Sequence, residues 1–394
     1  MGIYAYYVAS PFSYIVALFP QSRILDALLF IFLLKTGITG FNFGYYLHKT
    51  SKKTDKLTIV TFSILYSLTT YAVIHQHNSM WIDAMMWLPL ITLSIEDLIK
   101  NYKYRRFVIL LALTMMSNFY IGYMVCIYVA AYFFYYYFSR NEGWRNNPNH
   151  EPHHFRRSFL RIAGASALGI GISMVEVATA YYSLQFGKNT FSTPNFMPSL
   201  RFEFMDFLTK FLPGSYDTVR PEGLPILYCG MLTLIFVPLF FIAKKVPLRE
   251  KVGTGALVGI FVLSFSIDAV DKFWHGMQAP NWLNYRYSFM LCFFLVLFAE
   301  KAFEKLREIG YRKAAVSGAA LIGLLVMIQK LCKDSDNVRT FSMIWLSGAI
   351  IAVYLGTLRA VTFSKENVRR AGSLVLCVLV GAEMFGAGML NMDS

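Results

Sequence analysis

The sequence predicts an all-α integral membrane protein with about twelve transmembrane or partly spanning helices. Of its 394 residues, 56% are hydrophobic and 15% are charged, whereas an ordinary soluble domain is about 25% charged. Apolar runs of about 18 or more residues, which are long enough to cross about 30 Å of hydrocarbon, recur along the whole chain. One such run is compatible with a signal peptide, but so many are not. The five cysteines form neither a disulfide framework nor a metal-ligand spacing.

Twelve apolar segments are the predicted helices. They cover residues 24–46, 57–74, 80–99, 106–119, 121–138, 159–183, 224–243, 252–268, 283–300, 314–331, 341–358 and 371–390. The fourth and fifth share one apolar stretch that is broken by SNFYIG and has basic residues at both outer ends. Because basic flanks place both ends on one side of the membrane, this stretch predicts a hairpin of two short helices.

Lys and Arg are concentrated in alternate loops. One set of loops holds 26 of the 37 basic residues, the other holds 10, and Lys35 lies within a span. Cytoplasmic loops carry the excess of basic residues, so both termini are predicted to face outward from the cytoplasmic membrane. The net charge of +14 is then a topology signal and a contact with lipid headgroups rather than a nucleic-acid surface. We expect a single polytopic domain, 1–394, with 184–223 as a long outward loop.

The most unusual outward loop is WHGMQAPNWLNYRYSF (274–289). Tryptophans suit the boundary between membrane and water, but that interpretation does not explain the polar residues beside them. An arginine at the start of a span is costly to bury without an anionic partner, and its guanidinium can bind a phosphate through two hydrogen bonds. We therefore predict a surface for a sugar attached to a phosphate, formed by Trp274, His275, Gln278, Asn281, Trp282, Arg286 and Tyr287.

A second stretch, PGSYDTVRPEGLPILYCG (213–230), forms a stiff loop rich in proline and glycine. Asp217 and Arg220 lie three residues apart, so they either pair with each other or leave Arg220 to bind a ligand phosphate. On the SNFYIG turn, Asn118 and Tyr120 are expected to line the same outward cavity.

The third stretch, HQHNSMWIDAMMW (75–87), places Asp83 about one turn into an apolar span. A carboxylate there is costly unless it faces a polar cavity, where it would be a candidate general base. Alternatively, Asp83 caps the helix start or pairs with a neighbour. Asn78 and Lys35 join the candidate substrate-binding residues. Lys35 and Glu383 both lie near mid-span, which suggests an ion pair between them.

These stretches together resemble the YfhO family of bacterial membrane proteins. The matching strings are YYVASPF (6–12), LLKTGITG (33–40), NSMWIDAMMWLPL (78–90), SNFYIGYM (117–124), FLPGSYDTVRPEGLPILYCG (211–230) and WHGMQAPNWLNYRYSF (274–289). The resemblance covers essentially the entire chain. It implies a GT-C-like fold and transfer of a sugar from a polyprenyl-phosphate donor to an acceptor outside the membrane. The implied acceptor is a cell-wall or lipid-linked polymer such as lipoteichoic acid.

The chain departs from this family at both ends. Family members begin with a further span and a first outward loop that carries an acidic residue, and they continue into an outward soluble region. Residues 1–23 are therefore expected to be the remnant of that loop. The usual catalytic carboxylate of the first loop has no match here, which leaves Asp83 as a substitute. In the implied reaction Arg286 and Arg220 stabilise the departing polyprenyl phosphate, as fixed positive groups where negative charge develops.

Other functions remain open at this point. A transporter or flippase of a lipid-linked glycan would use the same contacts, and the chain could also be an inactive fragment of an enzyme. Transporters more often carry paired interrupted helices, whereas only 106–138 looks interrupted in this sequence. A divalent metal is compatible with the implied chemistry, but the sequence contains no set of ligands that predicts a metal site.

Overall fold

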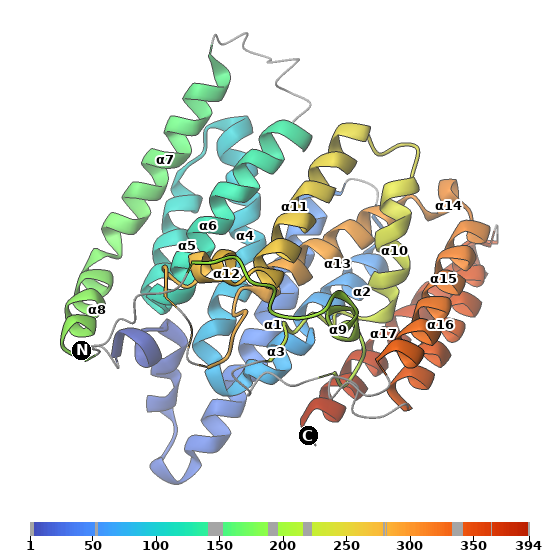
Figure 1. Ribbon diagram of the computed structural model, residues 1–394, viewed down its shortest axis with the longest axis horizontal. Coiled ribbons are helices and arrows are strands. Elements are labelled where there is room, and N and C mark those ends of the chain that lie inside the picture. Colours follow the sequence, from blue (N-terminus) through green and yellow to red (C-terminus); the bar gives the residue numbers. More distant parts are fainter. Residues whose placement is uncertain are drawn as a thin grey trace. The chain divides into compact units, whose positions relative to one another are not determined.

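The structure, a computed structural model, is helical and has no sheet in the residues that it describes (Figure 1). These residues are 4–51, 54–140, 153–187, 196–215, 223–278, 280, 282–332, 342–363 and 365–392. The all-α prediction is confirmed over these ranges.

The helices follow the predicted apolar segments closely. The first are α1 (Ile24–Thr50), α2 (Lys56–Ser67), α3 (Thr70–Ile74), α4 (Ser79–Asn101), α5 (Arg105–Ser117), α6 (Phe119–Tyr135), α7 (His154–Ile172) and α8 (Met174–Gly187). They are followed by α9 (Phe204–Thr209), α10 (Met231–Ile242), α11 (Leu248–Ser266), α12 (Asp268–Trp274), α13 (Ser288–Glu304), α14 (Leu306–Ile309), α15 (Tyr311–Leu331), α16 (Ser342–Val361) and α17 (Glu366–Met392). Shorter helical segments are η1 (Tyr4–Val8), η2 (Pro11–Leu18), η3 (Gln21–Arg23), η4 (His75–Asn78) and η5 (Tyr136–Arg140).

Three predicted segments differ from single straight helices. The segment 57–74 is broken between α2 and α3, and 159–183 consists of α7 and α8, which are bent by 65° relative to each other. The segment 224–243 begins with a non-helical run, 223–230, and becomes helical only at Met231. Hydropathy does not distinguish a buried non-helical run from a buried helix, so these breaks were not visible in the apolar pattern.

Five helical stretches of the described residues are long and apolar enough to cross a membrane. They are Gln21–Thr50, Phe119–Arg140, Tyr311–Leu331, Ser342–Val361 and Glu366–Met392, and there are up to seven if each bent helix pair forms one span. The protein is thus a helical multi-pass membrane protein with five to seven candidate spans. The twelve-segment count stays a prediction.

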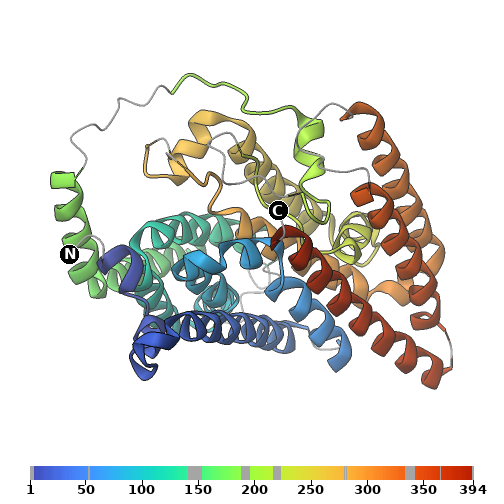
Figure 2. The ribbon, with the colours of Figure 1, turned by 90° about the horizontal axis from the view of Figure 1, so that it is seen from below.

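The chain divides into two compact units. Unit 1 comprises Met1–Asn42, His75–Ser199 and Leu248–Pro280, and unit 2 comprises Phe43–Ile74, Leu200–Pro247 and Asn281–Ser394. In unit 1, α4, α5, α6 and α7 pack against one another, and α11 and α12 contact α6. In unit 2, α10 packs on α13 and α15, and α15, α16 and α17 lie side by side (Figures 1 and 2).

The predicted helical hairpin in unit 1 is formed by α5 and α6. A single residue, Asn118, separates the two helices, with φ −161° and ψ 109°. Its side-chain oxygen accepts a hydrogen bond from the backbone N–H of Ile121 (2.9 Å), which caps the start of α6. A Cβ atom on Gly122 would lie 2.9 Å from the Cα atom of Met115, so only glycine allows this close approach of α5.

Gly230 connects the non-helical run 223–230 to α10 in unit 2. Its φ of 91° and ψ of 142° lie in a region that side chains disfavour, and an added Cβ would meet Leu65 Cδ2 at 2.3 Å. We expect Gly230→Ala to lower the free energy of unfolding by roughly 1–3 kcal/mol. Titration of the purified protein with SDS in mixed micelles measures this. The matched control is Gly381→Ala in α17, where no atom lies within 4 Å of the added Cβ. Equal effects at both positions would contradict the strained turn.

Candidate functional site

Lys35 and Asp83 form a buried ion pair in unit 1. Lys35 Nζ lies 2.9 Å from Asp83 Oδ1, and the two side chains are 0% and 1% exposed. The same ammonium group donates to the carbonyl oxygen of Ser79 at 2.8 Å and to Ser10 Oγ at 3.4 Å. The ring of Phe12 lies 5.4 Å from it. An ammonium group enclosed in this way is held by one full negative charge and by polar oxygens.

This pair corrects one prediction from the sequence. The predicted ion pair between Lys35 and Glu383 is wrong, because Lys35 pairs with Asp83. Asp83 thus has the neighbouring partner that one of its alternatives expected, and its role as a general base stays a prediction. Ser10, which belongs to the YYVASPF string, was missed as a member of this cluster, since a lone serine carries no signal of its own.

Glu383 has its own partners in unit 2. Its Oε1 accepts hydrogen bonds from Tyr228 Oη (2.6 Å) and from the backbone N–H of Met231 (2.7 Å). Its Oε2 accepts one from Tyr354 Oη. Glu383 lies on α17, Tyr354 on α16 and Met231 at the start of α10, so the carboxylate joins three segments of the unit.

Other predicted site residues extend the Lys35–Asp83 cluster within unit 1. Asn118 Nδ2 donates to the backbone oxygen of Tyr6 (3.0 Å), four residues before Ser10. Segment η1, which contains Tyr6, contacts α4, α5, α6 and α8. Asn78 occupies the N-cap position of α4, directly before Ser79, and is half-buried. The N-terminal segment therefore lies over the end of unit 1 at which α4 and α6 begin.

Tyr120 and His275 meet at the same end. Tyr120 Oη lies 2.5 Å from His275 Nδ1, and His275 Nε2 lies 3.5 Å from Asp271 Oδ1. The side chains of His275 and Asp271 are fully buried. Asp271 was missed by the sequence reasoning, although its spacing of four residues from His275, the C-cap residue of α12, was a usable signal. The structure thus brings together two predicted residues from the SNFYIG turn and the 274–289 stretch.

The rest of the 274–289 stretch is placed in different surroundings. In unit 1, Trp274 is buried and stacks on Phe261, with ring centroids 5.6 Å apart, and Gln278 is half-buried. In unit 2, Trp282 is 58% exposed and Tyr287 is fully buried. The guanidinium of Arg286 donates to the carbonyl oxygens of Trp282 (2.9 Å) and Leu283 (3.0 Å).

The backbone of this stretch is strained. Met277, Leu283 and Tyr285 have φ values of 63°, 55° and 59°. Non-glycine residues in the left-handed region cost about 1–3 kcal/mol each and cluster at functional sites. The observation supports a functional role for the loop without naming its ligand. Three predicted site residues, Asp217, Arg220 and Asn281, lie outside the described residues.

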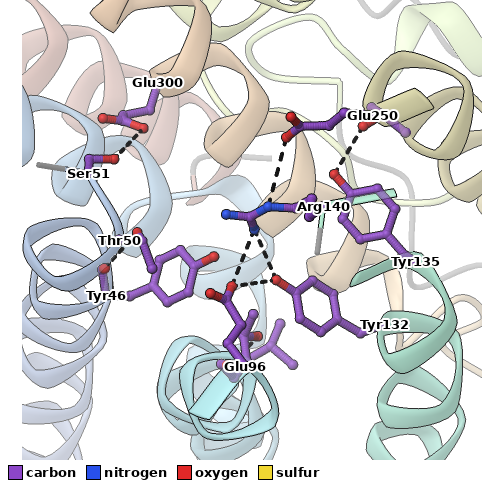
Figure 3. A network of polar contacts seen from close by, with 12 residues as sticks. Tyr46, Thr50, Ser51, Glu96, Tyr132, Tyr135, Arg140, Glu250 and Glu300 are labelled. Carbon is purple, nitrogen blue, oxygen red and sulfur yellow. Dashed lines mark hydrogen bonds and ion pairs between the residues drawn. The ribbon is translucent and has the colours of Figure 1, made fainter. Parts of the chain in front are cut away.

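A second polar network lies toward the other end of α4 (Figure 3). Arg140 contacts Glu96 at 3.3 Å, Tyr132 Oη at 3.1 Å and Glu250 at 3.8 Å. Tyr132 also donates to Glu96 at 2.7 Å. Glu96 follows Asp83 by thirteen residues in one helix, which is about 20 Å along the axis. This network therefore joins α4, α6 and α11 far from the Lys35–Asp83 pair, and sequence reasoning did not single it out.

A metal has no evident set of protein ligands in the described ranges. No group of three or more His, Cys, Asp and Glu side chains there is arranged to hold a metal ion. His75 packs on the ring of Trp81, with centroids 4.8 Å apart, and its centroid lies 6.3 Å from that of His77.

Comparison with known proteins matches the chain to one family over its whole length. The family model described as bacterial membrane protein YfhO matches residues 1–394. The uncharacterized protein YfhO of Bacillus subtilis (strain 168) is 24% identical over 332 residues, which are 82% of this chain and 34% of that protein. The chain thus spans about a third of the length of this relative. No solved structure matches it. The resemblance seen in the sequence is confirmed, and the chain belongs to the YfhO family of bacterial membrane proteins.

Proposed function

We propose that this chain forms the membrane part of a glycosyltransferase. Its donor is a polyprenyl-phosphate sugar, and its acceptor is a cell-wall or lipid-linked polymer outside the membrane, such as lipoteichoic acid. The observation that carries the proposal is the enclosed Lys35–Asp83 pair with Ser10 and the Ser79 carbonyl around it. Ionisable groups inside a membrane protein are costly and mark functional sites by default.

The location of this cluster supports the proposal. The loops that follow α1, α4 and η5 belong to the strongly basic set, whereas the Asp83 end of α4 carries little positive charge. Basic loops lie in the cytoplasm, so we infer that the Asp83 end and both termini face outward. This orientation is compatible with the GT-C-like fold that the resemblance to the family implies. A lipid-linked sugar in the outer leaflet would meet the protein at that end.

The proposed reaction is a direct displacement at the anomeric carbon of the sugar. Asp83 accepts the proton of the acceptor hydroxyl as the new glycosidic oxygen–carbon bond forms, and the polyprenyl phosphate leaves with the electron pair of the broken bond. Lys35 supplies positive charge in the same cluster. When the anionic donor arrives, the Lys35 ammonium moves away from Asp83, and the negative charge of the donor compensates for the lost contact. Asn78, Asn118, Tyr120 and His275 supply hydrogen bonds for sugar hydroxyls. The phosphate role of Arg286 and Arg220 stays a prediction.

A transfer assay with purified protein and a defined radiolabelled polyprenyl-phosphate sugar tests this mechanism. We expect the double variant Lys35→Gln/Asp83→Asn, which removes both buried charges together, to lose about a hundredfold in rate, as typical for removal of a general base. The control is Glu300→Gln, a buried carboxylate of unit 2 that accepts hydrogen bonds from Thr54 (2.9 Å) and Ser51 (3.4 Å). Each rate is divided by the amount of folded protein, which gel filtration measures. Transfer at the wild-type rate by the double variant would show that Asp83 takes no part in the reaction.

A transporter or flippase of a lipid-linked glycan is the second candidate. One observation favours it: the structure contains two bent or broken helix pairs, α2 with α3–α4 and α7 with α8. Interrupted helices are typical of transporter binding sites. Reconstitution into liposomes separates the two functions, because a flippase moves a fluorescent lipid-linked sugar across the bilayer without forming a new glycosidic bond.

A further inference from the structure

A groove runs between α10 and α15 in unit 2, and the proposed function does not use it. It encloses a cavity of about 580 Å³. Its apolar wall includes Leu239 and Ile242 of α10 and Val316, Ala320 and Leu324 of α15. Val316 and Ile242 are 63% and 51% exposed, so the cavity opens at the surface of the unit.

Small residues and a proline on the two facing helices leave space for this groove. Pro238 lies inside α10, and Ser317 and Ala320 face it from α15. Ser317 Oγ donates to the backbone oxygen of Ile235 at 2.8 Å, which ties the two helices together at the floor of the groove. On another side of α15, a Cβ added to Gly318 would lie 2.9 Å from Leu355, so α15 is held closely against α16. The groove is therefore a fixed feature between helices that are anchored.

One end of the groove is basic. Arg312 and Lys313, at the start of α15, line the cavity and are exposed. A neighbouring polar cavity of about 440 Å³ is lined by Arg307, Tyr311 and Arg369. The segments 304–313 and 362–370 together hold seven Lys and Arg against three Glu. An anionic group at this end therefore meets an excess of positive charge.

The length of the groove fits one leaflet of a bilayer. Arg312 and Leu324 are twelve residues apart on α15, which is about 18 Å along a helix. Half of a hydrocarbon core of about 30 Å is about 15 Å. A phosphate at Arg312 would therefore leave an acyl chain beside Val316, Ala320 and Leu324. Basic pockets between helices on the cytoplasmic side bind anionic lipid headgroups, and 301–313 and 358–370 belong to the basic loops.

We propose that the groove between α10 and α15 is a specific binding site for an anionic diacyl phospholipid. The phosphate binds Arg312 and Lys313, and one acyl chain occupies the apolar cavity. A second cavity of about 210 Å³ shares Pro238, Leu321 and Leu324 and continues toward Leu208 of α9. A longer polyprenyl chain is therefore the competing ligand that the experiment must distinguish.

Native mass spectrometry of the delipidated full chain tests this site with phosphatidylglycerol and phosphatidylcholine of identical acyl chains. We expect one tightly retained phosphatidylglycerol and weaker retention of phosphatidylcholine. Arg312→Gln/Lys313→Gln should weaken phosphatidylglycerol binding by about 30-fold, since each basic residue near an anionic headgroup contributes about a fivefold factor. The matched control is Arg156→Gln/Arg157→Gln, an adjacent exposed pair near the start of α7 that does not line the groove.

A third variant tests whether an acyl chain occupies the apolar cavity. Ala320→Phe fills the cavity and should displace the bound lipid while leaving both cations in place. If that variant does not fold, the double charge variant, which leaves the groove unchanged, decides alone. Equal loss of binding in the Arg156/Arg157 control, or unchanged binding without Arg312 and Lys313, would overturn the proposal. Displacement of phosphatidylglycerol by an equimolar polyprenyl phosphate would also overturn it, by assigning the groove to the longer chain.

Discussion

Replacing Lys35 with methionine is expected to lower the free energy of unfolding by about 3–5 kcal/mol, the usual effect of removing one partner of a buried ion pair. Asp83 would stay 1% exposed with its counter-charge gone, and the carbonyl of Ser79 would lose the donor that lies 2.8 Å away. Methionine fills a similar length of apolar space, so the effect reports the lost charge rather than a cavity. Unfolding of the purified protein by SDS in mixed micelles measures it.

The double variant Lys35→Met/Asp83→Leu separates the ion pair from the two single sites. Because both charges are then absent, we expect it to be more stable than Asp83→Leu or Lys35→Met alone, and close to the parent protein. The control is Arg106→Gln, whose partner Asp97 lies 3.8 Å away with side chains 48% and 33% exposed. Exposed pairs contribute about 0–1 kcal/mol. Additive losses in the double variant would contradict a coupled pair at Lys35 and Asp83.

The sequence located Lys35 and Asp83 but not their pairing. The apolar pattern placed Lys35 near the middle of 24–46 and Asp83 about one turn into 80–99, so the two seemed to lie at different depths. In the structure Lys35 is the twelfth residue of α1 and Asp83 is the fifth residue of α4. Because their side chains form an ion pair, the first turns of α1 extend past the start of α4. Depth estimated from the position of a residue within its own segment fails where neighbouring helices begin at different levels.

The fold was predictable where hydropathy carries the signal. Each of the twelve apolar segments contains a helix in the structure, because burying a backbone in an apolar medium requires its hydrogen bonds to be satisfied within the segment. The non-helical run 223–230 lies within the stretch 213–230, whose prolines and glycines predicted a loop, but the apolar pattern assigned the same residues to the span 224–243. The break at Ser173 was not predictable, since its residues are as apolar or as small as those of the neighbouring helices. The candidate site was likewise predictable only in part. Tyr120 and His275 were both predicted as site residues, but only the fold shows that their side chains are in contact.

Replacing Glu383 with alanine is the second large expected effect, again about 3–5 kcal/mol. The carboxylate accepts hydrogen bonds from Tyr228, Tyr354 and the backbone N–H of Met231, and each buried donor left without an acceptor costs about 1–3 kcal/mol. The N-cap residue of α10 is Gly230, which has no side chain to accept from the first N–H groups of that helix. Glu383, from α17, takes that place, so its removal weakens the start of α10 as well as the contact with α16.

A series at Glu383 shows whether hydrogen bonding or size is responsible. Glu383→Gln keeps the shape and one oxygen acceptor, so it should lose about 1–2 kcal/mol, less than alanine does. Tyr228→Phe and Tyr354→Phe should each lose about 1 kcal/mol, since each removes one donor and leaves the carboxylate two others. Glu366→Gln, an exposed residue paired with Arg370, is the control and should change the stability by less than about 0.5 kcal/mol.

If glutamine at position 383 were as damaging as alanine, the negative charge rather than the number of accepted hydrogen bonds would be what holds α10, α16 and α17 together. In that case the two tyrosine variants would have to be nearly neutral, because neither removes the charge.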